Sequence, residues 1–248
     1  MTTHGSTEPS GTEGDLPTWR RTLVVVAHPD DESFGLGGVI DALVRAGSSV
    51  RVLCLTAGEA STLHADDEVE LTLVRAAELE AAAERLGVTS TTLLRHPDGE
   101  LSHRIPDLLT SVREAVQVEA PDGLLVFGAG NGVTGHPDHE AATAAALAVA
   151  AERGLPVLEW CLPTEVAEAL NAELGASFAG HASDTLPITV RVDRDRQRRA
   201  IAAHASQAVP GSVLWRRLEL LADLEHLRLT RPQDSDRPLP PPNSGAPS

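Results

Sequence analysis

The stretch that decides the fold is TLVVVAHPDDESFG, residues 22–35. Five of its first six residues, 23–27, form a continuous apolar run, which is typical of a strand buried on both faces of a parallel sheet. A histidine, a proline and three acids follow at once. The tripeptide His-Pro-Asp returns at His96 and at His136. Because ligands bind outside the carboxyl ends of strands in open α/β sheets, we expect a functional site where this strand ends.

The remainder of the chain alternates between predicted strands and helices. We expect strands over residues 22–27, 50–56, 91–94, 123–128 and 156–160, and helices over 37–47, 66–87, 105–120, 137–154, 194–207 and 212–227. The section between 160 and 194 is less regular. Strands that are apolar throughout and alternate with helices predict an α/β fold, with a mostly parallel sheet and helices on both faces.

The length of 248 residues and the hydrophobic content of 42% suit one domain, which we expect over residues 19–230. Residues 1–18 and 231–248 are rich in Pro, Gly, Ser and charge. Such segments bury too little apolar area to offset the entropy of ordering them. Both are therefore predicted to be disordered tails.

The formal net charge of -16 argues against a nucleic-acid partner, since such proteins present clustered Lys and Arg to the phosphates. No stretch approaches the roughly 20 apolar residues that span a bilayer, and no secretory signal pattern begins the chain. We therefore predict a cytoplasmic protein without a membrane span.

Two of the three His-Pro-Asp copies offer a second metal ligand three positions after the histidine. Asp31 follows His28 in this way, and His139 follows His136, whereas Gly99 takes that position in the copy at His96. Catalytic zinc sites commonly use three His or carboxylate ligands and keep a fourth position for water. The two loops follow different strands, so the sequence predicts a metal site between them.

AHPDDE after an apolar strand, together with the distal HPDH, resembles the LmbE-like deacetylases, relatives of the N-acetylglucosaminyl-phosphatidylinositol (PIG-L) deacetylases. The resemblance continues through RAAELEAAAERLGV at residues 75–88, HPDG at 96–99 and AHASQ at 203–207. It implies a Rossmann-like fold. It also implies zinc-dependent hydrolysis of an N-acetyl or other N-acyl group from an amino sugar or related glycoconjugate.

Carried over residue by residue, the resemblance implies that His28, Asp31 and His139 hold the metal. Asp30 is then the general base that activates water. His136 is expected to stabilise the developing oxyanion and to protonate the departing amine. Asp138 has two interpretations: it orients His136, or it is an acid favoured by the N-terminal end of a helix.

Arg75 and Glu78 lie three apart on a predicted helix, where a solvated ion pair is the ordinary outcome. The resemblance implies instead that Arg75 reaches a substrate hydroxyl or phosphate. Asp98 matches a family acid that contacts sugar hydroxyls, although a turn Asp before glycine needs no ligand.

His204 and Gln207 match a late element of the family, and either pack near the site or contact the substrate. Thr134 stands where some members carry a tyrosine that polarises the substrate carbonyl. It either donates a weaker hydrogen bond there or is a turn residue. His136 would then carry more of the oxyanion stabilisation.

Two rival functions follow from other interpretations of the same residues. The first is a non-catalytic sugar-binding or regulatory relative with the same fold. The second is a nucleotide-dependent oxidoreductase, which is disfavoured because Ile40 occupies the place where the dinucleotide fingerprint after Gly35 requires glycine. Iron(II) tolerates the same ligands as zinc, and a homo-oligomer is compatible with the sequence.

Overall fold

The computed structural model describes residues 15–63, 68–130 and 133–232. Its strands are β1 Arg21–Val26, β2 Ser49–Thr56, β3 Ser90–His96, β4 Gly123–Phe127, β5 Val157–Pro163, β6 Gly180–His181, β7 Ile188–Arg191 and β8 Leu224–Thr230. Its α-helices are α1 Asp31–Phe34, α2 Gly37–Arg45, α3 Glu68–Leu86, α4 Ile105–Glu119, α5 Pro137–Arg153, α6 Thr164–Leu174, α7 Arg194–Ile201 and α8 Val213–Leu221. Two short 3-10 helices, η1 and η2, span Leu101–His103 and Ser183–Thr185.

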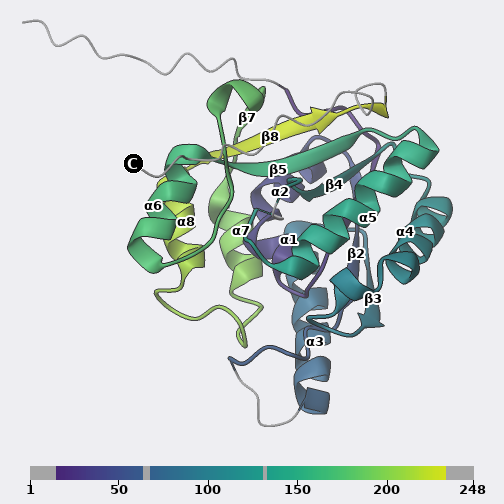
Figure 1. Cartoon of the computed structure of the whole chain (residues 1–248), viewed down its shortest axis with the longest axis horizontal. Coiled ribbons are helices and arrows are strands. Elements are labelled where there is room, and N and C mark those ends of the chain that lie inside the picture. Colours follow the sequence, from purple (N-terminus) through teal and green to yellow (C-terminus); the bar gives the residue numbers. More distant parts are fainter. Residues whose placement is uncertain (1–14, 64–67, 131–132, 233–248) are drawn as a thin grey trace, which may run out of the picture.

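Across these described ranges, one sheet of eight strands has the order β3-β2-β1-β4-β5-β8-β7, with β6 added beside β5 (Figure 1). The pairs formed among β1 to β6 are all parallel. β8 runs antiparallel to both of its neighbours, β5 and β7. The prediction of an α/β fold with a mostly parallel sheet is therefore confirmed.

Helices cover both faces of the sheet, as the continuous apolar strands predict. Along β1, Leu23 and Val25 enter the core formed with α4 and α5, which lie side by side (Figure 1). Val24 and Val26 point to the opposite face and enter the core formed with α2, α3 and α6. Successive side chains of a strand point to opposite faces, so a strand covered on both sides must be apolar throughout.

The predicted irregular section after residue 160 contains regular structure. β5 continues to Pro163, and α6 follows it directly. Val166, Ala167 and Leu170 are the buried residues of α6 and recur at helical spacing. The helix follows Pro163 directly, since proline is well tolerated at the start of a helix.

The predicted helix over residues 212–227 is wrong in its second half. α8 ends at Leu221, and the chain turns through Ala222, which has a positive φ of 49°. The next residues form β8, with Glu225 and Leu227 buried. Only its last five residues, HLRLT, alternate with period two, and this short signal becomes decisive only through the pairing of β8 with β5 and β7.

The predicted helix over residues 194–207 is too long, since α7 ends at Ile201. The backbone N–H groups of Ala203, His204 and Gln207 then bond three residues back, which is the geometry of tight turns. His204 and Gln207 therefore lie on a turn segment and not on the helix. The predicted start of α3 at Asp66 and Asp67 lies outside the described residues.

The predicted disordered tails fall almost entirely outside the described residues, and the domain boundaries at 19 and 230 remain predictions. The first strand starts at Arg21 and the last ends at Thr230. Among the described helices, none is both long and apolar enough to cross a bilayer.

Candidate metal and amide-hydrolysis site

Three of the predicted residues meet where β1 and β4 end side by side. His28 follows β1, Asp31 opens α1, and His139 lies in the first turn of α5. The His28 Nδ1 and His139 Nε2 atoms are 3.1 Å apart. Asp31 lies 3.1 Å from His139 Nε2 through Oδ1 and 3.6 Å from His28 Nδ1 through Oδ2. The expectation that the two distant loops adjoin is thus met.

The other nitrogen of each imidazole ring faces side-chain oxygen atoms. His28 Nε2 lies 2.9 Å from Asp98 Oδ1 and 3.4 Å from Asp138 Oδ2. His139 Nδ1 lies 2.6 Å from the Thr134 hydroxyl oxygen. Carboxylates only accept hydrogen bonds, so a proton on His28 Nε2 is the one that these two carboxylates can stabilise. A cation bound by Nδ1 of His28 and Nε2 of His139 would follow the pattern of metal-binding histidines that are oriented by outer partners.

The charges around this cluster are strongly coupled. Burial disfavours protonation of His28, but the carboxylates of Asp138, Asp31 and Asp98 outweigh it and raise its pKa well above the usual value. Burial likewise acts to raise the pKa of Asp31, yet His139 and His28 hold it well below its usual range. A concentrated negative charge that attracts protons also attracts a divalent cation.

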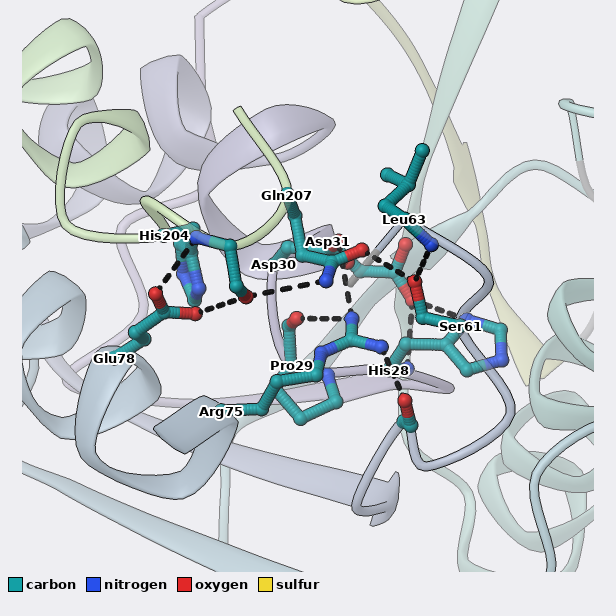
Figure 2. A network of polar contacts seen from close by, with 12 residues as sticks. His28, Pro29, Asp30, Asp31, Ser61, Leu63, Arg75, Glu78, His204 and Gln207 are labelled. Carbon is teal, nitrogen blue, oxygen red and sulfur yellow. Dashed lines mark hydrogen bonds and ion pairs between the residues drawn. The ribbon is translucent and has the colours of Figure 1, made fainter. Parts of the chain in front are cut away.

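Asp30 lies beside this cluster in a constrained conformation. Its φ of 137° falls in the region that non-glycine residues rarely adopt. Arg75 holds it through an ion pair of 3.1 Å to Oδ2 and also donates to the Pro29 and Gly58 carbonyl oxygens (Figure 2). Burial raises the pKa of Asp30 to about 6, although the charge of Arg75 opposes this shift. A carboxylate of this kind is suited to accept a proton near neutral pH.

Glu32 completes the environment of Asp30 and was given no role from the sequence. It is fully buried, and its Oε2 accepts the backbone N–H of Asp30 at 3.0 Å. Its Oε1 accepts from Ser33 and lies 2.7 Å from His204 Nε2. The sequence feature that could have pointed to Glu32 is its place as the third consecutive acid of HPDDE. An acid in a turn has several ordinary explanations, however, so this feature alone does not predict a role.

Arg75 and Glu78 share one face of α3 but do not pair with each other. Arg75 serves Asp30, while Glu78 accepts the backbone N–H and the hydroxyl of Ser206 at 2.8 and 2.6 Å. Gln207, next in the chain, accepts from the Ser61 hydroxyl at 2.9 Å (Figure 2). Glu78 therefore anchors the turn after α7 that brings Gln207 over the site.

His136 is the N-cap residue of α5, and its Nδ1 accepts the backbone N–H of Asp138 at 3.2 Å. Burial, followed by the charges of His28 and His139, lowers its pKa. The Asp138 carboxylate turns away and accepts from the Gly99 and Leu101 N–H groups at 2.7 and 3.1 Å. Asp138 therefore adjoins His28 and does not orient the His136 ring through its carboxylate.

Two groups of three side chains have ligand atoms within 4.8 Å of one another: His28 with His136 and His139, and His28 with Asp98 and Asp138. All of them surround the same imidazole. The described residues thus bring one compact set of histidine and carboxylate ligands to the end of β1.

A cavity of about 690 Å³ opens over this cluster. The predicted site residues that line it are His28, Asp30, Asp31, Arg75, Asp98, Thr134, His136, His139 and Gln207. Glu78, Asp138 and His204 lie behind this layer and contact it from the interior. The volume lies within the range of about 300–1,000 Å³ that small-molecule sites occupy.

Comparison with known proteins finds a family and its relatives. The family model described as "PIG-L: GlcNAc-PI de-N-acetylase" matches residues 23–150. A 1D-myo-inositol 2-acetamido-2-deoxy-alpha-D-glucopyranoside deacetylase of Kineococcus radiotolerans is 31% identical over 224 residues, which cover 70% of this chain and 62% of that protein. The chain thus spans less than two thirds of that relative. A probable N-acetyl-alpha-D-glucosaminyl L-malate deacetylase 2 of Bacillus anthracis is 29% identical over 76% of this chain and 81% of its own length.

Solved structures agree on the fold. The zinc inhibited form of teicoplanin deacetylase Orf2 superposes with a TM-score of 0.64 at 22% identity, covering 85% of this chain and 98% of that one. At this level of identity the likeness concerns the fold.

Proposed function

Because the chain belongs to the PIG-L family of GlcNAc-PI de-N-acetylases, we propose that it is a metal-dependent hydrolase that removes an N-acyl group from an amino sugar. The observation that carries the proposal is the facing pair of imidazole nitrogens beside Asp31, in a cavity large enough for a sugar. Both relatives described above are named as deacetylases of N-acetylglucosamine derivatives.

The donor set fits a divalent cation. Ligand atoms of a tetrahedral zinc site, with bonds of about 2.0–2.1 Å, lie about 3.3–3.4 Å from one another. The distances among His28 Nδ1, His139 Nε2 and Asp31 are 3.1 to 3.6 Å. We assign the third position to Asp31 in preference to His136, because its carboxylate offsets the charge of the ion. When bound, the ion would polarise the amide carbonyl and lower the pKa of a water beside it.

Asp30 is the proposed general base. Its carboxylate lines the cavity next to Asp31, and 16% of its side chain is exposed there. The ion pair with Arg75 fixes the carboxylate, so that it can accept the proton of the attacking water without a change of rotamer. Arg75 is thus a positioning residue, and the substrate contact predicted for it remains a prediction.

His136 is the proposed donor to the amide oxygen. With Nδ1 accepting from Asp138, the neutral ring carries its proton on Nε2. The lowered pKa keeps the ring in this neutral form at physiological pH. A donor at Nε2 suits stabilisation of the negative charge that develops on the carbonyl oxygen.

Zinc is the ion we propose, with iron(II) as the alternative that the same ligands accept. The substrate we propose is a small N-acylated glucosamine derivative. The cytoplasmic location predicted from the sequence stays a proposal, as does a homo-oligomer.

The test is an amine-release assay on a panel of N-acetylated glucosamine glycosides, run with chelator, with zinc and with iron(II). Zinc is titrated, since excess zinc can occupy further sites. We expect turnover that chelator abolishes and one metal ion restores. Asp30→Asn should keep one bound ion per chain and lose nearly all turnover, whereas His139→Ala should lose the ion.

Equal turnover in Asp30→Asn and the parent would overturn the assignment of the base. Binding of glycosides by the metal-loaded protein without release of any amine would favour the rival function, a non-catalytic sugar-binding relative.

A further inference from the structure

Aromatic residues are scarce in this chain, and its phenylalanines, unlike its three tryptophans, all line the cavity. The sequence contains three phenylalanines and no tyrosine. All three phenylalanines, Phe34, Phe127 and Phe178, line the cavity over the histidine cluster. They come from α1, the end of β4 and the segment after α6, so their convergence is a property of the fold and not of one local stretch.

The sheet order separates this apolar lining from the polar lining. Ser61 and Asp98 follow β2 and β3, on one side of β1. Phe127 ends β4, and Phe178 and Leu214 belong to the region of α6 and α8, on the other side. α6 and α8 pack together, away from β3 and α3 (Figure 1). The metal-ligand cluster, defined here as His28, Asp31 and His139, lies between the apolar and the polar lining, because its members follow β1 and β4.

The apolar side, defined here as Phe34, Phe127, Phe178, Val213 and Leu214, has fixed walls. The Phe127 ring lies 4.9 Å from that of His139 and packs so closely on Gly35 that a Cβ there would lie 2.2 Å from its Cε1. The Phe178 backbone accepts from and donates to the Asn171 amide at 3.0 and 2.7 Å.

Arg217 brings one positive charge to the cavity lining on this side. The guanidinium donates to the Phe34 carbonyl oxygen and lies 5.0 Å from the centre of the Trp160 ring. Burial lowers its pKa to about 10. Its charge offsets part of the negative charge of Glu225 and Asp31.

We propose that the apolar side binds the alkyl chain of an N-acyl group longer than acetyl. The amide carbon must lie at the cluster, so the sugar and the acyl chain extend to opposite sides of it. The hydroxyl-rich sugar suits Asp98, Ser61 and Gln207, which leaves the phenylalanine-lined side for the acyl chain. This inference rests on the proposed function and names its substrate class.

The test is a series of methyl glucosaminides that carry N-acetyl, N-butyryl, N-hexanoyl and N-octanoyl groups, assayed by amine release. We expect kcat/KM to rise by about fourfold for each methylene that enters the apolar side, up to the length that fills it. A second series keeps N-acetyl and lengthens the glycosidic alkyl group. We expect no comparable rise there.

Val213→Trp should narrow the apolar side and reduce the ratio of hexanoyl to acetyl kcat/KM at least tenfold. Val118→Trp is the matched control, because Val118 is 79% exposed on α4, on the other face of the sheet. It should leave that ratio unchanged.

Turnover that falls as the acyl chain lengthens, with acetyl the best substrate, would overturn this inference and leave the proposed function intact. A rise confined to the glycosidic series would also overturn it. Failure of every amide in both series, with metal bound, would overturn the proposed function and this inference together.

Discussion

The Thr134 hydroxyl contacts Nδ1 of His139, the ring nitrogen that faces away from His28 and Asp31. Neither sequence-based interpretation of this residue, a donor to the substrate or a plain turn residue, included that role. Its hydroxyl lies 2.6 Å from His139 Nδ1 and 3.3 Å from the backbone nitrogen of His136. Such outer partners fix the tautomer and the direction of a metal-binding ring.

Thr134→Val keeps the shape of the side chain and removes this hydrogen bond. We expect the affinity for zinc to fall by about 10- to 100-fold, because the His139 ring loses the partner that orients it. Competition with a chelator of known affinity measures this change. Thr134→Ser keeps the hydroxyl and should bind nearly as well as the parent. Equal affinities of the Val and Ser variants would refute the role.

Glu32 is a second single residue that supports the site, because its carboxylate accepts the backbone N–H of Asp30. Glu32→Gln cannot accept from Asp30 N–H, Ser33 and His204 with the same geometry, since one carboxylate oxygen becomes a donor. We expect a loss of about 1.5–3 kcal/mol in the free energy of unfolding, measured in urea. We also expect a lower kcat with an unchanged zinc content, because Asp30 is no longer held at its unusual φ.

The matched control for this variant is Glu80→Gln, an exposed position on the same helix as Arg75. It should leave both stability and kcat near the parent values. If Glu32→Gln behaves like this control, the buried pair with His204 has no part in holding Asp30.

At the scale of elements, the motif-bearing strands and their helices were predictable because their signals are local. β1, β2, α2 and α5 are each encoded by one continuous apolar or periodic run. β8 was not predictable in this way. Its residues fit a helix as well as a strand, and Glu225 is buried only because Arg194 and Trp160 from distant segments contact it. Pairing partners far along the chain decided the outcome.

β8 is joined to β5 by a charged pair that makes its stability depend on pH. Glu159 and Arg228 face each other across the two strands, with Nη2 and Oε2 2.6 Å apart. Burial acts to raise the pKa of Glu159, but Arg228, Thr230 and the Ala129 N–H outweigh it and lower the pKa. A carboxylate with a lowered pKa stabilises the fold above its unfolded pKa of about 4.3, and loses that effect as the pH falls further.

Glu159→Gln should therefore destabilise the protein most near neutral pH. We expect its deficit in unfolding free energy, relative to the parent, to shrink as the pH falls below about 4. Urea titrations over a pH series measure it. Glu152→Gln breaks the exposed pair with Arg113 and should show a small deficit. A Glu159→Gln deficit that is independent of pH would mean that the carboxylate charge contributes nothing.

At the scale of the whole molecule, site residues could be predicted when they belong to one short sequence motif. They could not be predicted when they come from separate elements that only the fold brings together. His28, Asp30, Asp31 and His139 belong to two short motifs with a known order. The three phenylalanines of the cavity come from separate elements, and no spacing along the chain links them. The turn that brings Gln207 over the site depends on Glu78, 129 residues before Gln207 in the chain.

The metal-ligand cluster also joins the two layers of helices. His28 lies in the loop before α1 and Asp31 is the first residue of α1, a helix that packs with α2, α3 and α7 on one face. His139 belongs to α5, which packs with α4 on the other face. An ion held by all three would therefore connect both cores at the end of the central strand. Because the ligands are brought together only in the folded chain, binding free energy adds to folding stability.

Removal of the ion should consequently lower the melting temperature of the entire domain. At a free zinc concentration of about 100 times Kd, binding contributes about 2.7 kcal/mol. For a chain of this length that corresponds to a rise of about 5 to 10 °C in Tm. Calorimetry with chelator and with zinc measures the shift. Asp30→Asn, which keeps all three ligands, should retain it, whereas His139→Ala should show none. A shift of equal size in His139→Ala would place the stabilising ion elsewhere on this acidic protein and would remove the basis for assigning the ligands to the loops after β1 and β4.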